Sequence, residues 1–458
     1  MRVALAQLAV LATLAGTARA EIWTLPKLIE QVRSDHPNVV AARATLDDAH
    51  AQLEWVNRQW APRGDLGATL GGAPRVRCAP STLKENPNTS GCVATQVVDQ
   101  ARYSGSWLDA QPVNGLLASF HFNIQQPLYT SGKIENGRDA AKGNIEYNRA
   151  LMETAQADLE AAAVRIYYTI KWAVAALATV EDLCAFMHTW VERIRREVDA
   201  GTTRYSLNDL KRMEIGTESY EQLRIDITRS LKNAIAGLHE LTGDPRAQVD
   251  GAPLEERAHP LPPLAEFVDA SQTRRVEVKQ ITGGLRGLKG LARVRISEML
   301  PDIGVTSGFS FGYAASVEIP KLAFAVVNPN GQGPSLALGL TMPLGFAQKL
   351  AIFEQADADA RALEIKRRYY LSAIAFDVSM AYATAEAAEK KRALTDHAEK
   401  ITRGLYALID EQYALGLAGP LDLVDAGRNY YGQRLAHLQA MLDVEVSDSA
   451  LRRASGVP

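Results

Sequence analysis

The chain lacks several residues and motifs that would define its chemistry. Only 3 of its 458 residues are cysteine, which excludes a disulfide-framework mini-protein and a multi-cysteine zinc or iron–sulfur site. Lys and Arg total 50 against 53 Asp and Glu, a formal net charge of −3, which argues against a nucleic-acid binder. Beyond the N-terminus no run of 18 or more apolar residues occurs, so helical membrane transport is excluded.

Nucleotide and metal motifs are missing as well. Neither a GxxxxGK[ST] loop nor a GxGxxG loop occurs, so any energy must come from a partner. The 8 histidines show no close metal-ligand spacing, and we expect no metal, no cofactor and no enzymatic activity. An exported hydrolase would need converging titratable groups in a concave site, and the sequence shows none.

The first 20 residues have the pattern of an export signal. Arg2 is followed by an apolar stretch from Val3 to Ala15, and Ala18-Arg19-Ala20 matches a cleavage site. The alternative is a buried N-terminal helix. Cleavage would leave Glu21 first, which argues against lipidation of the mature N-terminus. We therefore predict export by a bacterium.

The rest of the chain shows a duplicated plan. A helix–strand–strand–helix order is predicted for residues 21–243 and again for 264–458, with a proline-rich linker at 244–263. The expected strands and long helices of the two repeats are, in chain order, 64–72, 117–126 and 129–199, then 302–313, 335–342 and 345–414.

The expected strands alternate between apolar and small polar residues. Phe309, Phe311 and Tyr313 fall on one face, while Gly308, Ser310 and Gly312 fall on the other. An ordinary soluble sheet would carry Lys and Glu on its polar face, whereas this nearly uncharged face is typical of a membrane barrel lumen. Because four strands cannot close a barrel and lipid permits no open edge, three copies contributing twelve strands are expected.

The expected helices are long and carry heptads. No proline interrupts 129–199, a span of ~105 Å if fully helical. Six heptads run from Leu159 to Ile194 and from Ala163 to Val198 with both seam positions apolar, which predicts a coiled coil. In the second repeat the register slips near Arg392 and resumes with an apolar series at Leu394, Ile401, Leu408 and Leu415.

Each long helix ends at a glycine, Gly201 and Gly416, which suits a left-handed helix cap. After the second turn, Asp422 and Asp425 lie one helical turn apart, and Asp209 is their counterpart in the first repeat. One interpretation is that these acids favour the helix N-terminus electrostatically. In a threefold tube the same pair would instead form two carboxylate rings that select cations.

These features together resemble the TolC family of trimeric outer-membrane efflux proteins. The resemblance covers nearly all of the mature chain and depends on the duplicated plan, the Gln126-Pro127-Leu128 and Met342-Pro343-Leu344 segments and the two glycine turns. It implies a mainly α fold with a twelve-stranded β-barrel shared by a homotrimer in outer-membrane lipid. A long α-helical coiled-coil tunnel would continue into the periplasm of a Gram-negative bacterium. A periplasmic adaptor would bind its tip and link it to an inner-membrane pump of an efflux or type I secretion system.

The resemblance also implies roles for particular residues. Tyr413, Gly416, Asp422 and Asp425 match the family's entrance gate, although Ala418 stands where some members have a closing arginine. The adaptor would grip the turns, and the residues expected there are Gly201, Thr202, Leu207, Asp209, Gly416, Leu417 and Leu421. The alternative function is a periplasmic coiled-coil adaptor without a pore, which would lack the four strands and the duplication.

The cysteines have simpler expected roles. Cys78 and Cys92 lie in the 73–115 connection, where export permits a disulfide. Two free thiols are the alternative. Cys184 occupies a heptad seam position and is expected to be a packed core thiol.

Overall fold

The computed structural model describes residues 22–73, 115–201, 205–256, 260–314 and 331–457. The chain divides into two compact units. We call them the helical unit, which comprises Met1–Ala49, Gly143–Leu285 and Ala362–Pro458, and the strand unit, which comprises His50–Lys142 and Arg286–Arg361. Among the described helices, none is both long enough and apolar enough to cross a membrane. The expected signal at 1–20, Cys78, Cys92 and Thr202 lie outside the described residues.

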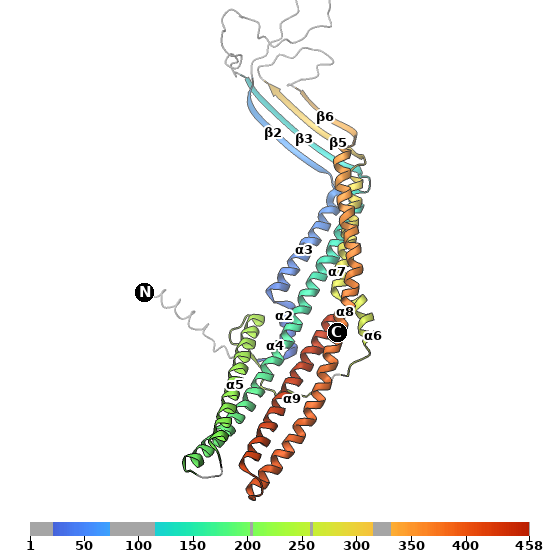
Figure 1. Cartoon of the computed structure of the whole chain (residues 1–458). Helices are drawn as coiled ribbons and strands as arrows, with labels where there is room; N and C mark the ends of the chain where they lie inside the picture. The colour runs from blue at the N-terminus through green and yellow to red at the C-terminus, as the bar shows by residue number, and fades with distance from the viewer. Residues whose placement is uncertain (1–21, 74–114, 202–204, 257–259, 315–330, 458) are drawn as a thin grey trace, which may run out of the picture. The chain divides into compact units, whose positions relative to one another are not determined.

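The strand unit contains a four-stranded antiparallel sheet in the order β2-β3-β5-β6 (Figure 1). Its strands are β2 (Arg63–Ala73), β3 (Gly115–Tyr129), β5 (Asp302–Ala314) and β6 (Gly331–Thr341). Each repeat supplies one neighbouring pair, and the β3–β5 pairing joins the repeats. Strand β3 runs three residues past the expected end at 126, with a shift in register between Pro127 and Tyr129.

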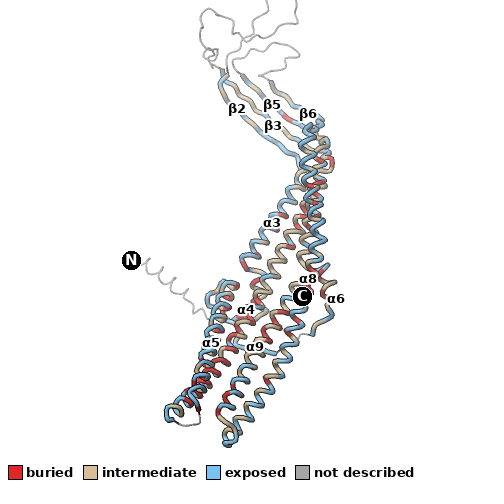
Figure 2. The backbone as a smooth tube through the Cα atoms, viewed as in Figure 1, coloured by how far each residue is buried: buried red, intermediate tan, exposed pale blue. Residues whose placement is uncertain are grey.

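The strand register gathers the apolar side chains on one face of the sheet. Leu66 lies opposite Phe122, which lies opposite Phe309. This face is exposed rather than covered: Leu336 and Leu338 are 79% and 73% exposed, and Figure 2 shows most of these strands as exposed or intermediate. An apolar face of this size is rare on a soluble surface and marks contact with another protein or with lipid.

The opposite face of the sheet is small and polar. His121 lies opposite Gly67 and Ser310 in the register, and its ring approaches the position that a Gly67 side chain would occupy, at 2.3 Å from an ideal Cβ. Asp65 accepts a hydrogen bond from Asn123 at 3.2 Å. The alternation expected from the sequence therefore separates two chemically different surfaces.

The described residues include four long helices and several shorter helices and strands. In chain order the helices are α2 (Leu25–Ser34), α3 (Pro37–Asn57), α4 (Lys133–Asp199), α5 (Leu207–Thr242), α6 (Leu264–Arg274), α7 (Val276–Ser297), α8 (Phe346–Ala414) and α9 (Pro420–Ser455). A short 3-10 helix, η1 (Arg58–Trp60), precedes β2, and β1 (Ile22–Trp23) pairs in parallel with β4 (Gln248–Val249) of the linker. Helix α4 starts at Lys133 rather than 129 because Ser131 and Gly132 form a turn with φ of 51° and 83°.

The heptad seam of α4 is buried within the helical unit. Ala173, Val180, Met187 and Ile194 have no measurable exposure, and α5 and α9 supply residues to the same cores. Cys184 lies on this seam as a buried free thiol, and burial raises its pKa to about 11. Both seam positions predicted in α4 are therefore core positions.

The second heptad series of α8 behaves differently from the expectation. Leu394, Ile401, Leu408 and Leu415 are 70%, 57%, 49% and 68% exposed. The side of α8 that enters the core carries Tyr406, Ile409 and Tyr413 instead. The slip near Arg392 is therefore not simply a change of supercoiling within one chain. It marks an apolar stripe that faces away from the chain's own core.

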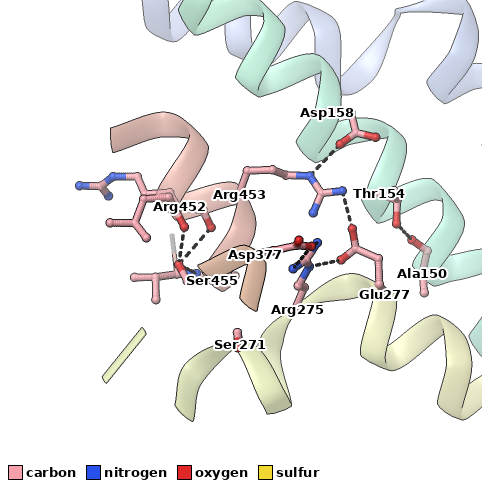
Figure 3. A network of polar contacts seen from close by, with 12 residues as sticks. Ala150, Thr154, Asp158, Ser271, Arg275, Glu277, Asp377, Arg452, Arg453 and Ser455 are labelled. Atoms are coloured by element: carbon pink, nitrogen blue, oxygen red, sulfur yellow. Dashed lines mark hydrogen bonds and ion pairs between the residues drawn. The ribbon is translucent and has the colours of Figure 1, made fainter. Parts of the chain in front are cut away.

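A network of ion pairs fastens the C-terminal end of α9 to its neighbours (Figure 3). Arg453 donates to Asp158 of α4 and to Glu277 of α7, each at 2.7 Å. Arg275 donates to the same Glu277 at 2.9 Å and to Asp377 of α8 at 3.3 Å. Because the Arg453 and Arg275 side chains are only 18% and 13% exposed, this network is partly shielded from solvent and salt.

Replacing Arg453 by methionine should lower the free energy of unfolding by about 2–4 kcal/mol, because a partly buried carboxylate loses its partner while the aliphatic stem is kept. Arg229→Met, which breaks an exposed pair with Asp226, should change it by less than about 1 kcal/mol. Denaturant unfolding of the purified protein measures both. Equal changes in the free energy of unfolding for the two variants would show that the ion-pair network does not stabilise the fold.

The cost of this substitution should depend on pH. Burial raises the pKa of Glu277, but the hydrogen bond and charge of Arg453 outweigh it and hold the pKa below its ordinary value of 4.5. A carboxylate with a lowered pKa stabilises the fold above that value, and its contribution is lost as pH falls through the folded pKa. The difference in free energy of unfolding between wild type and Arg453→Met should therefore decrease below pH 4.5.

Candidate gate and docking surface at the helical turns

The two helical hairpins turn through glycines in the left-handed region. Gly201 ends α4 with φ of +71°, and Gly416 ends α8 with φ of +76°. The Gly201 amide donates to Val198 and the Gly416 amide to Tyr413, both at 3.0 Å. Among the described residues, nothing lies within 4 Å of the Cβ position at either glycine, so backbone conformation rather than space favours glycine here.

The helices that follow the turns start in a similar way. In α5 the Asp209 carboxylate accepts from the Ser206 amide at 3.0 Å and from its hydroxyl at 2.7 Å. In α9 the Asp422 carboxylate accepts from the Gly419 amide at 2.9 Å. The hydrogen bonds from Ser206 lower the pKa of Asp209. The structure therefore gives Asp209 and Asp422 equivalent capping contacts, as the duplicated plan predicts.

Asp425 has a different environment from Asp422. Its side chain is 71% exposed, and its partner among the described residues is Arg428, at 3.5 Å. Arg428 also donates to the hydroxyl of Tyr220 on α5 at 3.0 Å. One arginine therefore links an exposed acid of the second hairpin to a tyrosine of the first.

An aromatic cluster joins the two hairpins beside the turns. Phe186 of α4 packs at centroid distances of 6.1 Å from Tyr406 of α8 and 6.0 Å from Tyr431 of α9. Gly427 makes room for this ring, since an ideal Cβ there would lie 2.6 Å from Phe186. Tyr413, expected at the gate, stacks edge-on against Trp190 at 5.5 Å. Residues that follow both turns, Tyr205, Leu210, Leu423 and Val424, belong to the same core.

The residues expected to bind an adaptor lie at the surface of the turns. Leu207, Leu417 and Leu421 are 60%, 77% and 36% exposed, and Gly201 and Gly416 are exposed between them and the helix ends. Three exposed leucines beside two turns form an apolar surface that the core of the chain does not use. Sequence reasoning missed Phe186, Tyr220, Tyr406 and Arg428, because single aromatics and arginines on long helices carry no spacing signal.

Comparisons with known proteins agree with this architecture. Residues 288–457 match the family model described as outer membrane efflux protein. No curated protein sequence matches the chain. The outer-membrane channel OprN shares 15% identity and a TM-score of 0.72, covering 95% of this chain and 90% of its own.

Two further solved structures are similar over the same length. The outer membrane protein VceC from Vibrio cholerae shares 16% identity and a TM-score of 0.70, with 94% of this chain and 96% of that chain covered. The MtrE outer membrane channel of Neisseria gonorrhoeae, solved in its open state, shares 18% identity and a TM-score of 0.69, with 94% and 88% covered. Residues 288–457 are therefore similar to the outer membrane efflux protein family, and the fold of the chain is that of solved outer-membrane channels.

Proposed function

We propose that this chain is one third of an outer-membrane exit duct for efflux or type I secretion. The observation that carries the proposal is the sheet β2-β3-β5-β6, which has an exposed apolar face and, among the described strands, no partner beyond β2 and β6. Unpaired backbone groups at a sheet edge cannot face lipid. Pairing β2 of one copy with β6 of the next would close twelve strands from three copies around a polar lumen.

The exposed stripe on α8 supports the same assembly. Leu394, Ile401, Leu408 and Leu415 recur at seven-residue intervals and are all exposed in the single chain. A heptad stripe of this kind packs against another helix. In the homotrimer it would meet a helix of the neighbouring copy and so extend the barrel as a helical tunnel across the periplasm.

The helical turns would form the regulated end of the duct. Three copies would place Asp422 and Asp425 in rings, where carboxylates attract cations and repel anions. Within each copy, the link from Arg428 to Tyr220 and Asp425 would tie the hairpins together and supply a closing contact that Ala418 does not. The exposed residues Leu207, Leu417 and Leu421, with Gly201, Thr202 and Gly416, would bind a periplasmic adaptor, which in turn engages an inner-membrane pump.

The alternative of a periplasmic adaptor without a pore has no support. Such a protein would lack the four strands and the duplication, whereas the described residues include all four strands. The family match and the fold are likewise those of outer-membrane channels.

Conductance in a planar bilayer tests the proposal. The purified mature protein should give a small, cation-preferring conductance, and Asp422→Asn/Asp425→Asn should lose the cation preference because the ring charge is removed. Asp209→Asn removes the equivalent capping charge of the first repeat and serves as the matched control, which should keep the preference.

Each outcome decides a different part of the proposal. Unchanged selectivity in the double variant would keep the duct and overturn the acidic gate. No channel from protein that is folded and trimeric would overturn the duct itself.

A further inference from the structure

We propose that Glu256, Asp396 and His437 form a binding site for a divalent transition-metal cation such as Zn²⁺. The three residues come from the linker between the repeats, from α8 and from α9, all within the helical unit. Each offers one ligand atom, and these atoms lie within 4.8 Å of one another. The site is separate from the turns and does not depend on the proposed exit duct.

The histidine is the residue that distinguishes this site from a surface cluster of acids. His437 is only 8% exposed. Its Nδ1 lies 3.4 Å from the hydroxyl of Thr395, and that hydroxyl already donates to the Lys391 carbonyl at 2.9 Å. Because the hydroxyl has one proton, it can only accept from the ring. In this arrangement Nδ1 would donate to the hydroxyl, and the lone pair of Nε2 would be available to a metal ion.

Within the described residues, His437 makes its hydrogen bond through Nδ1, to Thr395, so Nε2 is left for a ligand. Metal-binding histidines commonly have this arrangement, in which the second ring nitrogen is held by an oxygen that fixes the tautomer. The contact from Thr395 would perform that role.

Each of the two carboxylates also accepts a hydrogen bond from a basic side chain. Arg392 donates to one oxygen of Glu256, and Lys400 donates to Oδ2 of Asp396 at 2.7 Å. No hydrogen bond is made to Glu256 Oε2 or Asp396 Oδ1 within the described residues.

The donor set indicates the class of cation. One imidazole nitrogen and two carboxylate oxygens suit Zn²⁺, which accepts three protein ligands and keeps a fourth position for water. Mg²⁺ prefers six oxygens in an octahedron. Two carboxylates balance the charge of a dication, while Arg392 and Lys400 oppose it, so we expect micromolar rather than nanomolar affinity. A bound ion would fasten the linker to α8 and α9.

The test uses the purified full-length mature protein after treatment with EDTA. Calorimetric titration with Zn²⁺ should show one ion per chain, and Co²⁺ in its place should give the visible absorption of a four-coordinate site. His437→Gln and Asp396→Asn should each weaken Zn²⁺ binding at least tenfold. His397→Gln, which changes an exposed histidine of the same helix, is the matched control and should bind like wild type. Excess Mg²⁺ should not displace Zn²⁺.

Two results would overturn the proposal. One is the absence of Zn²⁺ binding by the folded wild-type protein at millimolar metal. The other is equal binding by wild type, His437→Gln and Asp396→Asn, which would place the ion elsewhere on the chain. Asp396 is half-buried, so its asparagine variant keeps the test decisive if His437→Gln does not fold.

Discussion

Replacing Ile401 and Leu408 by aspartate should convert the protein from a trimer into a folded monomer and abolish its conductance. Both side chains are about half exposed in the single chain, at 57% and 49%, and neither belongs to one of its buried hydrophobic clusters. In the proposed trimer they lie on a heptad seam against a neighbouring copy. A charge buried there without a partner costs several kcal/mol per ion, and threefold symmetry repeats that cost at every interface.

The measurement is the molar mass in detergent by light scattering, with the helical content of each variant followed by circular dichroism. Ala407→Asp/Ala414→Asp adds the same charge at exposed positions of α8 that lie roughly 100° to 140° around the helix from Ile401 and Leu408, at about 100° per residue. This control should remain trimeric. A trimer that persists in Ile401→Asp/Leu408→Asp would show that the stripe is not the assembly surface.

The stripe also shows what a heptad pattern can predict. The spacing of Leu394, Ile401 and Leu408 correctly identifies an apolar seam, since each residue recurs on one side of a helix. It carries no information on which helix covers the seam. In α4 the equivalent pattern meets the chain's own α5 and α9, whereas in α8 it faces outward. Choosing between these arrangements requires the tertiary structure.

The sheet was more predictable than the helical packing. Period-2 alternation depends only on local geometry, and the structure places Leu66, Phe122 and Phe309 on the single face that the sequence indicates. The strand ends were harder to predict, because the extra length of β3 depends on its pairing with β5 around Pro127.

The candidate sites also differ in whether they depend on local sequence relations or on contacts between distant residues. The capping role of Asp422 follows from its position three residues after Gly419, a local relation. The group of Glu256, Asp396 and His437 joins three elements that are far apart in sequence, so spacing among histidines could not find it. The contact of Phe186 with Tyr406 and Tyr431 crosses the two repeats in the same way.

Replacing Phe186 by alanine should destabilise the closed arrangement of the helical turns and increase the fraction of channels that are open. The ring is half-buried and contacts the second hairpin through Tyr406 and Tyr431, so its loss should remove about 2–3 kcal/mol of packing free energy. If the closed arrangement uses these contacts and the open one does not, the open fraction rises by roughly 30- to 140-fold while it remains small, at about 1.4 kcal/mol per tenfold change.

Single-channel recording at fixed protein concentration measures this shift, and two comparisons separate gating from simple loss of stability. Phe267→Ala truncates a buried aromatic of another core of the helical unit, so it should lower the unfolding midpoint without opening the channel. Gly427→Ala acts in the opposite steric sense, since its Cβ would lie 2.6 Å from the Phe186 ring and would push the hairpins apart. A cavity and an overpacked contact at one interface should both open the tip. If neither Phe186→Ala nor Gly427→Ala raises the conductance above that of Phe267→Ala, the aromatic cluster stabilises the fold and does not keep the channel closed.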